Sequence, residues 1–287
     1  MIEAKNVVKT FDGFRALDGA TLTVPKGAVY GLVGPNGAGK STIIRHLTGV
    51  YRADSGEILL DGQPIYENSA MKERVVSIPD DWYYFPQASI AEMAKLYEGM
   101  YPTFSRERYE KMKQVFPLND KQMIRRMSKG MQKQAAFWLT MCCMPEYLLL
   151  DEPVDGLDPV MRRQVWSLLL GDVAERGTTV LVSSHNLREL EDVCDHVGIM
   201  NKGKVLLERT LSDLQDKENY HLLRRVVSTC LTEREADIIR RRYGLDGQPP
   251  QTQKQIAAVY HISRSYVSRI EKKALEKLEK ELRDLVQ

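Results

Sequence analysis

The sequence predicts an α/β domain followed by a small all-α domain. An apolar segment at Ala28–Gly34 is typical of a buried parallel strand, and it runs directly into a glycine-rich loop and a helix. Two more apolar segments, Tyr147–Asp151 and Thr178–His185, also have the character of strands buried on both faces. After Leu222 only helical periods occur. We therefore expect an α/β domain over residues 1–219 and an all-α domain over residues 220–287.

The composition is that of a globular protein with two differently charged parts. Of the 287 residues, 43% are hydrophobic and 28% charged, which is ordinary for a folded chain. The start lacks the apolar stretch of a secretory signal, and no apolar run approaches the ~20 residues of a membrane span, so we expect a cytoplasmic location. Residues 1–218 carry a formal charge of −3 and residues 219–287 carry +5. A basic module suggests a polyanionic partner, although a solvated helical surface accounts for the charge equally well.

The loop after the first buried strand has the spacing of a phosphate-binding loop. Residues 34–41 read GPNGAGKS, which matches GxxxxGK[ST] between a strand and a helix. Glycines allow successive backbone N–H groups to converge on phosphate oxygens, and the helix N-terminus adds partial positive charge. Lys40 can reach the β and γ phosphates, and the Ser41 hydroxyl is placed to ligate Mg²⁺.

Two carboxylates end the strand at Tyr147–Asp151. Asp151 is expected to hold Mg²⁺ through water, as in a Walker B strand. Glu152 follows at the carboxyl edge of the same strand, where it can orient or deprotonate the water that attacks the terminal phosphate. His185 ends the strand at Thr178–His185, a position at which a histidine taken alone is more often structural.

Further motifs occur in a fixed order along the first 219 residues. Residues 127–132 read MSKGMQ and resemble a variant of the LSGGQ signature, residues 156–159 read GLDP and resemble a D-loop, and His185 stands where an H-loop histidine would. Together with the phosphate loop and the Walker B strand, these motifs resemble the ABC-type nucleotide-binding domain of P-loop NTPases. The helical stretch that interrupts the α/β pattern, about residues 83–130, is similar to the ABC helical subdomain.

The resemblance implies an ATPase in which two such domains face each other head to tail. ATP and Mg²⁺ would then lie between the phosphate loop of one domain and Ser128 and Gly130 of the other. His185 would contact the γ phosphate beside Glu152, and Asp158 would communicate across the dimer. By matching positions, Phe11 would stack on adenine, although it also fits a core position, and the phosphates would be held by Gly34, Asn36, Gly37, Ala38, Gly39, Lys40, Ser41 and Thr42.

Two segments depart from the family pattern. Lys129 and Met131 replace residues of the LSGGQ signature. At the Q-loop position stands Asp80, which can still bind Mg²⁺ or water but cannot donate an amide hydrogen.

The aromatic run at residues 82–85 would suit the rim of a groove that accepts a membrane subunit, and it fits the core of the subdomain equally well.

The basic C-terminal part predicts a helix-turn-helix. Thr232 and Glu235 form a capping box at the start of one helix. A short helix over Thr252–Tyr260, a turn at residues 261–263 and a long helix from Arg264 follow. This part resembles region 4 of bacterial sigma factors, which implies that four side chains approach base edges in the major groove of DNA: Arg264, Ser265, Ser268 and Arg269.

Three interpretations of the whole chain remain. The first is the ATP-hydrolysing subunit of an ABC transporter, which acts with a second nucleotide-binding domain and a separate membrane permease, and so lies at the inner face of the cell membrane. The second is a cytosolic regulator in which ATP-driven dimerisation sets the spacing of two DNA-binding modules, with DNA or RNA polymerase as a partner. The third is an incidental or artificial fusion of the two parts.

Overall fold

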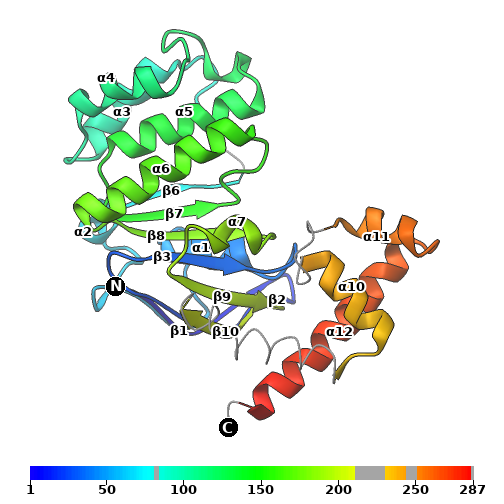
Figure 1. Cartoon of the computed structure of the whole chain (residues 1–287). Coiled ribbons are helices and arrows are strands. Elements are labelled where there is room, and N and C mark those ends of the chain that lie inside the picture. The colour runs from blue at the N-terminus through cyan, green and yellow to red at the C-terminus, as the bar shows by residue number, and fades with distance from the viewer. Residues whose placement is uncertain (81–83, 211–229, 244–250, 286–287) are drawn as a thin grey trace.

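The computed structural model of the chain describes residues 1–80, 84–210, 230–243 and 251–285. Residues 1–210 form an α/β unit, and the helices after residue 230 form a second, all-α unit (Figure 1). The predicted fold class is therefore confirmed. The proposed boundary between residues 219 and 220 lies outside the described residues and stays a prediction.

A six-stranded sheet forms the centre of the α/β unit, with strand order β10-β9-β3-β8-β7-β6. All neighbouring strands run parallel except β10, which pairs antiparallel with β9 at one edge. The carboxyl ends of the parallel strands therefore meet at one edge of the sheet, where ligands of open α/β sheets bind. The strands are β3 (Val29–Val33), β6 (Val75–Ile78), β7 (Tyr147–Asp151), β8 (Thr179–Ser184), β9 (His196–Asn201) and β10 (Lys204–Thr210).

A second, antiparallel sheet packs beside the first, with strand order β2-β1-β4-β5. Its strands are β1 (Ile2–Phe11), β2 (Phe14–Val24), β4 (Ser55–Leu60) and β5 (Gln63–Pro64). β1 and β2 form a hairpin whose last pair is Phe11 opposite Phe14. The hairpin therefore ends with two aromatic side chains.

The central strands β3, β7 and β8 of the six-stranded sheet are buried along their whole length, which explains their mainly apolar sequences. Along β7, Tyr147 and Leu149 pack with α1 (Lys40–Leu47) and the antiparallel sheet, whereas Leu148 and Leu150 belong to a second core on the opposite face. That second core includes α5 (Lys129–Cys142) and α6 (Pro159–Arg176). The alternation follows from the two-residue period of a strand.

A helical segment follows β6 and covers one end of this second core (Figure 1). It contains α3 (Ile90–Met100), α4 (Arg106–Val115), the 3₁₀ turn η1 (Ile124–Arg126) and the start of α5. The helices predicted between residues 83 and 130 are present, but α5 continues to Cys142. Of the aromatic run, Tyr84 donates to the Gln132 carbonyl and packs on the core, Phe85 is exposed, and residues 82–83 lie outside the described residues.

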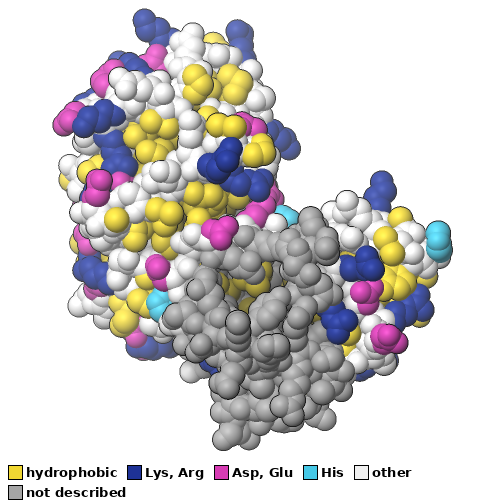
Figure 2. Space-filling view, viewed as in Figure 1, with side chains coloured by type: hydrophobic (Ala, Val, Ile, Leu, Met, Phe, Trp, Pro, Cys, Tyr) yellow, Lys and Arg dark blue, Asp and Glu magenta, His cyan; other side chains and the backbone are white. Residues whose placement is uncertain are grey.

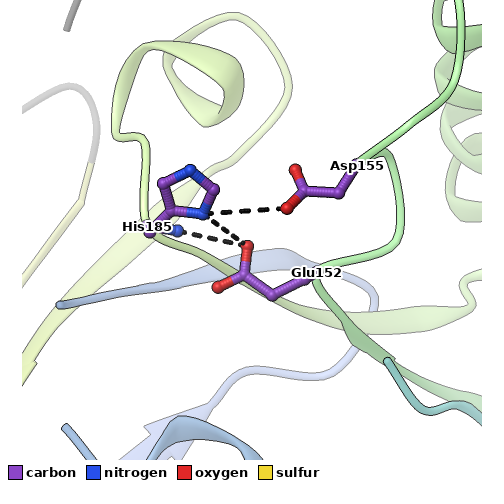
Figure 3. A group of neighbouring side chains, drawn as sticks. All are labelled: Glu152, Asp155 and His185. Atoms are coloured by element: carbon purple, nitrogen blue, oxygen red, sulfur yellow. Dashed lines mark hydrogen bonds and ion pairs between the residues drawn. The ribbon is translucent and has the colours of Figure 1, made fainter. Parts of the chain in front are cut away.

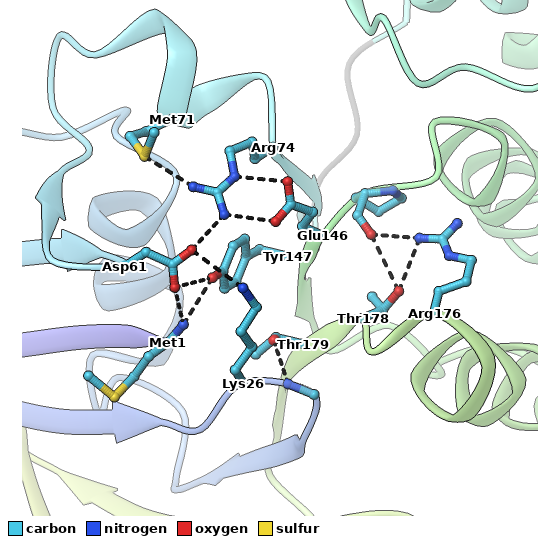
Figure 4. Close-up of polar contacts among 12 residues, drawn as sticks. Met1, Lys26, Asp61, Met71, Arg74, Glu146, Tyr147, Arg176, Thr178 and Thr179 are labelled. Carbon is cyan, nitrogen blue, oxygen red and sulfur yellow. Dashed lines mark hydrogen bonds and ion pairs between the residues drawn. The ribbon is translucent and has the colours of Figure 1, made fainter.

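A polar cluster ties the antiparallel sheet to the start of β7 (Figure 4). The Asp61 carboxylate accepts hydrogen bonds from the N-terminal ammonium of Met1, at 2.6 Å, and from the Tyr147 hydroxyl, at 2.7 Å. Arg74 bridges Asp61 and Glu146. Partial burial opposes ionisation of Asp61, but these hydrogen bonds outweigh it and lower its pKa. The cluster is at the opposite end of β7 from Asp151.

The C-terminal unit consists of α10 (Glu233–Tyr243), α11 (Gln253–Val259) and α12 (Arg264–Leu285). The predicted capping box is present, because Thr232 and Glu235 exchange side-chain and backbone hydrogen bonds. α11 and α12 are joined by a short turn in which His261 has a φ of +52°. The three helices enclose two small apolar cores formed by Leu231, Ala236, Ile239 and Ala274, and by Ile238, Ile256, Ala257 and Val267.

Candidate ATP-binding site

The phosphate loop leaves β3 at the carboxyl edge of the parallel sheet and enters α1. Gly37 and Gly39 have φ values of +82° and +106°, a region that costs other residues about 1 kcal/mol or more. A Cβ on Gly34 would lie 2.2 Å from the Met200 carbonyl oxygen of β9. The glycines of this loop are therefore required by its shape, as their spacing predicted.

A cavity of about 360 Å³ lies over this loop. Its polar lining comes from the loop together with two acidic side chains from other strands. All the predicted phosphate-binding residues except Gly34 therefore line one space. The lining residues are Phe14, Ala16, Asn36, Gly37, Ala38, Gly39, Lys40, Ser41, Thr42, Asp80 and Glu152.

Lys40 is 5% exposed and its ammonium group is held by the loop itself. Its Nζ donates to the Gly34 carbonyl at 2.8 Å and lies 3.2 Å from Glu152 Oε1. A buried ammonium needs a partner for its charge. The Glu152 carboxylate supplies that negative charge. A phosphate oxygen entering the cavity can replace it.

The Glu152 carboxylate lies beside the side chains of His185 and Asp155 at the carboxyl edge of the sheet (Figure 3). Its Oε2 lies 3.0 Å from Nδ1 of His185, which follows β8, and also accepts the His185 backbone N–H. Asp155 Oδ2 lies 3.9 Å from the same ring nitrogen. The structure thus brings together Lys40, Glu152 and His185, all predicted from separate motifs.

Opposite charges shift the pKa values of this pair in opposite directions. The hydrogen bond to Glu152 raises the pKa of His185 above its ordinary value, against the effect of burial. For Glu152, burial opposes ionisation, but the His185 hydrogen bond and the Lys40 charge outweigh it and lower the pKa. Glu152 is therefore an ionised carboxylate at neutral pH, the form in which it can accept a proton from water.

This pairing predicts the titration of His185. In the free chain, the His185 pKa should lie above 6.5, and Glu152→Gln should lower it, because the hydrogen bond and the charge of this carboxylate are lost and only the Asp155 charge then opposes burial and the Lys40 charge. A raised histidine pKa stabilises the fold below pH 6.5, and that contribution is lost as pH rises through the folded-state pKa. NMR titration of the imidazole signals measures the shift. The exposed Glu175→Gln is the control; an identical His185 titration in the wild type and in Glu152→Gln would contradict the prediction.

Asp151 is buried at the end of β7, next to Glu152. Its Oδ1 accepts a hydrogen bond of 2.6 Å from the Ser183 hydroxyl, and Ser183 Oγ in turn accepts the Glu152 backbone N–H at 3.0 Å. Ser183 thus fixes both carboxylate residues to β8. The motifs did not single it out, because only the pairing of β7 with β8 places Ser183 opposite Asp151.

The residues expected to act on a partner's nucleotide lie elsewhere. Of the described residues, those lining the cavity do not include Ser128, Gly130 or Asp158. Ser128 caps the start of α5 by accepting the Met131 N–H, and Asp158 caps the start of α6. Their positions at helix N-termini, outside their own subunit's cavity, are compatible with the contact across a dimer that the resemblance implies.

The aromatic side chains at the end of the β1–β2 hairpin differ in their surroundings. Phe11 packs its edge against Tyr51, with ring centroids 5.4 Å apart, and does not line the described cavity. Phe14 lines it and is 67% exposed. The motif position indicated Phe11, whereas only the three-dimensional arrangement identifies Phe14 as a neighbour of the phosphate loop.

The predicted DNA-facing residues lie together at the start of α12. Arg264, Ser265, Ser268 and Arg269 are all exposed, and the Arg269 guanidinium stacks over Tyr266 at 5.5 Å. Arg234 of α10 lies over the same ring at 5.8 Å. Figure 2 shows several separate basic side chains on the C-terminal helices, with hydrophobic and a few acidic ones among them.

The strand–loop–helix around Lys40 and the carboxylates at the end of β7 define a P-loop ATPase. The family model for "ABC transporter" matches residues 17–155, and that for "Sigma-70, region 4" matches residues 229–280. The ABC transporter ATP-binding protein YtrB of Bacillus subtilis is 31% identical over 76% of this chain and 74% of its own length. The chain therefore belongs to the family of ABC transporter ATP-binding subunits and is an ATPase that carries a sigma region 4-like C-terminal module.

Other relatives and solved structures agree with this assignment. The daunorubicin/doxorubicin resistance ATP-binding protein DrrA of Streptomyces peucetius is 32% identical, over 82% of this chain and 73% of its own. A solved ATP-binding subunit of an ABC transporter superposes with a TM-score of 0.70 and 26% identity, covering 76% of this chain and 93% of that one. In the described part of the chain, no helix has both the length and the apolar character that a membrane crossing requires.

Proposed function

We propose that this chain energises a separate membrane subunit by ATP-driven dimerisation of its α/β unit, at the inner face of the cell membrane. The observation that supports this most directly is that Glu152, which lines the cavity over the phosphate loop with Lys40, contacts both Lys40 and His185. A water attacking the terminal phosphate from this side would find an ionised carboxylate beside it.

The groups in and beside the cavity then have separate roles in phosphoryl transfer. The loop amides and Lys40 bind the β and γ phosphates, Glu152 accepts the proton of the attacking water, and His185 holds the γ phosphate beside it. Magnesium fits Ser41 and Asp151, because the Asp151 carboxylate is buried and kept in place by Ser183, and oxygen ligands suit this ion. When bound, the ion would neutralise phosphate charge.

The second half of each ATP site comes from a partner subunit in this proposal. Ser128 and Gly130 would contact the γ phosphate held by the partner's loop, and Asp158 would lie at the contact between the two sites. The cassette MJ0796, solved as a dimer, superposes with a TM-score of 0.67 at 22% identity, which establishes a shared fold. The position of Ser128 at the tip of α5, outside its own cavity, supports the same arrangement.

The adenine-binding residue and the residue at the Q-loop position remain to be assigned in this proposal. Both aromatic side chains at the tip of the hairpin are candidates to stack on adenine: Phe11 by its motif and Phe14 by its place in the cavity. Asp80 lines the cavity near Glu152 and would bind water or the magnesium ion there.

Purification from membranes tests the transporter proposal. Detergent extraction followed by capture of the tagged full chain should recover an integral membrane protein in stoichiometric amount. ATP turnover of the recovered complex should differ from that of the chain alone. Recovery of the chain entirely from the soluble fraction, without a membrane protein, would contradict the proposal.

The exposed side chains at the start of α12 favour a second function, binding of DNA by the C-terminal unit. A recognition helix presents its N-terminal residues to base edges, and the exposed side chains of Arg264, Ser265, Ser268 and Arg269 occupy that part of α12. Dimerisation through ATP would bring two such helices to a fixed spacing. RNA polymerase is the further partner that the sigma resemblance implies.

Selection from random duplexes tests this second function. The full chain should enrich a defined sequence, and Arg264→Ala should weaken binding to it by roughly 5- to 150-fold while relaxing the preference at one base position. Arg163→Ala, an exposed arginine of α6, is the matched control. Gel-shift titrations at two salt concentrations measure both effects. Failure to enrich any sequence over shuffled duplexes, with and without ATP, would contradict DNA recognition.

A further inference from the structure

The backbone of Glu152 adopts a conformation that must be held in place. Its φ is +47°, in the left-handed region, which costs a residue with a Cβ about 1–2 kcal/mol. Hydrogen bonds fix the backbone on both sides of this residue: the Glu152 N–H donates to Ser183 Oγ at 3.0 Å, and the Glu152 carbonyl accepts from Lys133 Nζ at 2.7 Å and, more weakly, from the Asp155 N–H at 3.4 Å. The first partner belongs to β8, whereas the second belongs to α5.

Lys133 differs from the other groups around Glu152 because it comes from the helix that Ser128 caps. It lies on the second turn of α5 and is half-buried. Its ammonium donates to a carbonyl, a charge-assisted hydrogen bond that is stronger than one between neutral groups. Lys133 contacts the backbone of Glu152 and not its carboxylate. It can therefore fix the position of the Glu152 backbone, and so of its Cβ, without neutralising the charge of the carboxylate.

A second contact joins the same two elements. A Cβ added to Gly130, in the first turn of α5, would lie 3.2 Å from the Gly156 carbonyl oxygen, so helix and loop approach closely there. The segment 152–156 that follows β7 is therefore touched by α5 at both ends, at Glu152 by Lys133 and at Gly156 by Gly130. A displacement of α5 cannot leave this segment unchanged.

We infer that Lys133 is a positioning residue for ATP hydrolysis, which transmits the position of α5 to Glu152. Because Ser128 caps the start of α5, contact of Ser128 with a partner's nucleotide would bring the Glu152 of the same subunit into line with its own attacking water. The positioning role rests on the ATPase activity of the family, and the link between two sites rests on the proposed dimer.

Steady-state kinetics of the full chain test this role. Lys133→Met should lower kcat on the order of tenfold, with KM for ATP within about twofold, because the phosphate contacts are untouched. Lys133→Arg, which keeps a charged donor, should recover most of the lost rate. Lys121→Met, an exposed lysine between α4 and η1, should match the wild type. Isothermal titration with ATP should give the same affinity for all four proteins.

The outcomes separate a positioning role from a structural one. A kcat for Lys133→Met equal to that of the wild type would overturn the inference, as would a rise in KM that accounts for the whole loss of kcat/KM. A lower melting temperature with no recovery in Lys133→Arg would also overturn it, since Lys133 would then only stabilise the fold. A wild-type chain that binds no ATP would contradict the ATP site itself, independently of Lys133.

Discussion

Replacing Glu152 with Gln should abolish ATP turnover while the chain still binds ATP and accumulates as a dimer. Gln has the size of Glu and can keep a contact with His185, but it cannot accept the proton of the attacking water. Loss of a general base of this kind lowers kcat by about 10²- to 10⁴-fold. Phosphate release measures turnover, and light scattering with magnesium and ATP measures the dimer.

The control for this experiment is Glu175→Gln in α6, which removes an exposed carboxylate that does not line the cavity. It should turn over ATP at the wild-type rate and dissociate after hydrolysis. Wild-type turnover in Glu152→Gln would show that another group activates the water, and the role given to this carboxylate would be wrong.

The sequence predicted the parts of the site whose chemistry depends on local spacing. The phosphate loop needs glycines at fixed positions because its backbone enters the left-handed region at Gly37 and Gly39. The carboxylates at the end of β7 follow an apolar strand that is buried on both faces. Because parallel strands end at one edge of a sheet, motifs more than a hundred residues apart could be expected to meet there.

The groups that the sequence did not reveal depend on contacts between distant elements. Phe14 enters the cavity through the shape of the β1–β2 hairpin, which no periodicity encodes. In the sequence, nothing distinguishes Ser183 from other polar residues at strand ends. Only the register of β7 with β8 places it opposite Asp151. In the sequence, Lys133 looks like any other lysine of a helix. Only the packing of α5 places its ammonium group against the Glu152 carbonyl.

The C-terminal unit could be predicted in more detail, because its fold is local. The capping box of Thr232 and Glu235 depends on helical spacing alone, and it is present. The buried Glu271 was not predicted. It is held by Tyr243 of α10 and Gln253 of α11, so its partners come from two other helices.

Lys40→Met should weaken ATP binding by roughly 10- to 150-fold. A charge-assisted hydrogen bond to phosphate contributes about 1.5–3 kcal/mol, and each 1.4 kcal/mol is a factor of ten. The loop amides remain, so binding is weakened but not lost. Isothermal titration with magnesium and ATP measures the change. Lys26→Met, which removes a lysine whose side chain is 63% exposed, is the control, and equal affinities for wild type and Lys40→Met would contradict the role.

The same substitution has a consequence in the free chain, because Lys40 is also the counter-charge of Glu152. Without it, the pKa of Glu152 should rise towards its ordinary value. A carboxyl group with a lowered pKa stabilises the fold above its unfolded-state pKa, and that contribution is lost as pH falls through the folded-state pKa. The difference in melting temperature between wild type and Lys40→Met should therefore be largest near neutral pH and shrink in acid. A difference that grows as pH falls would show that Lys40 does not hold the Glu152 carboxylate in its ionised form.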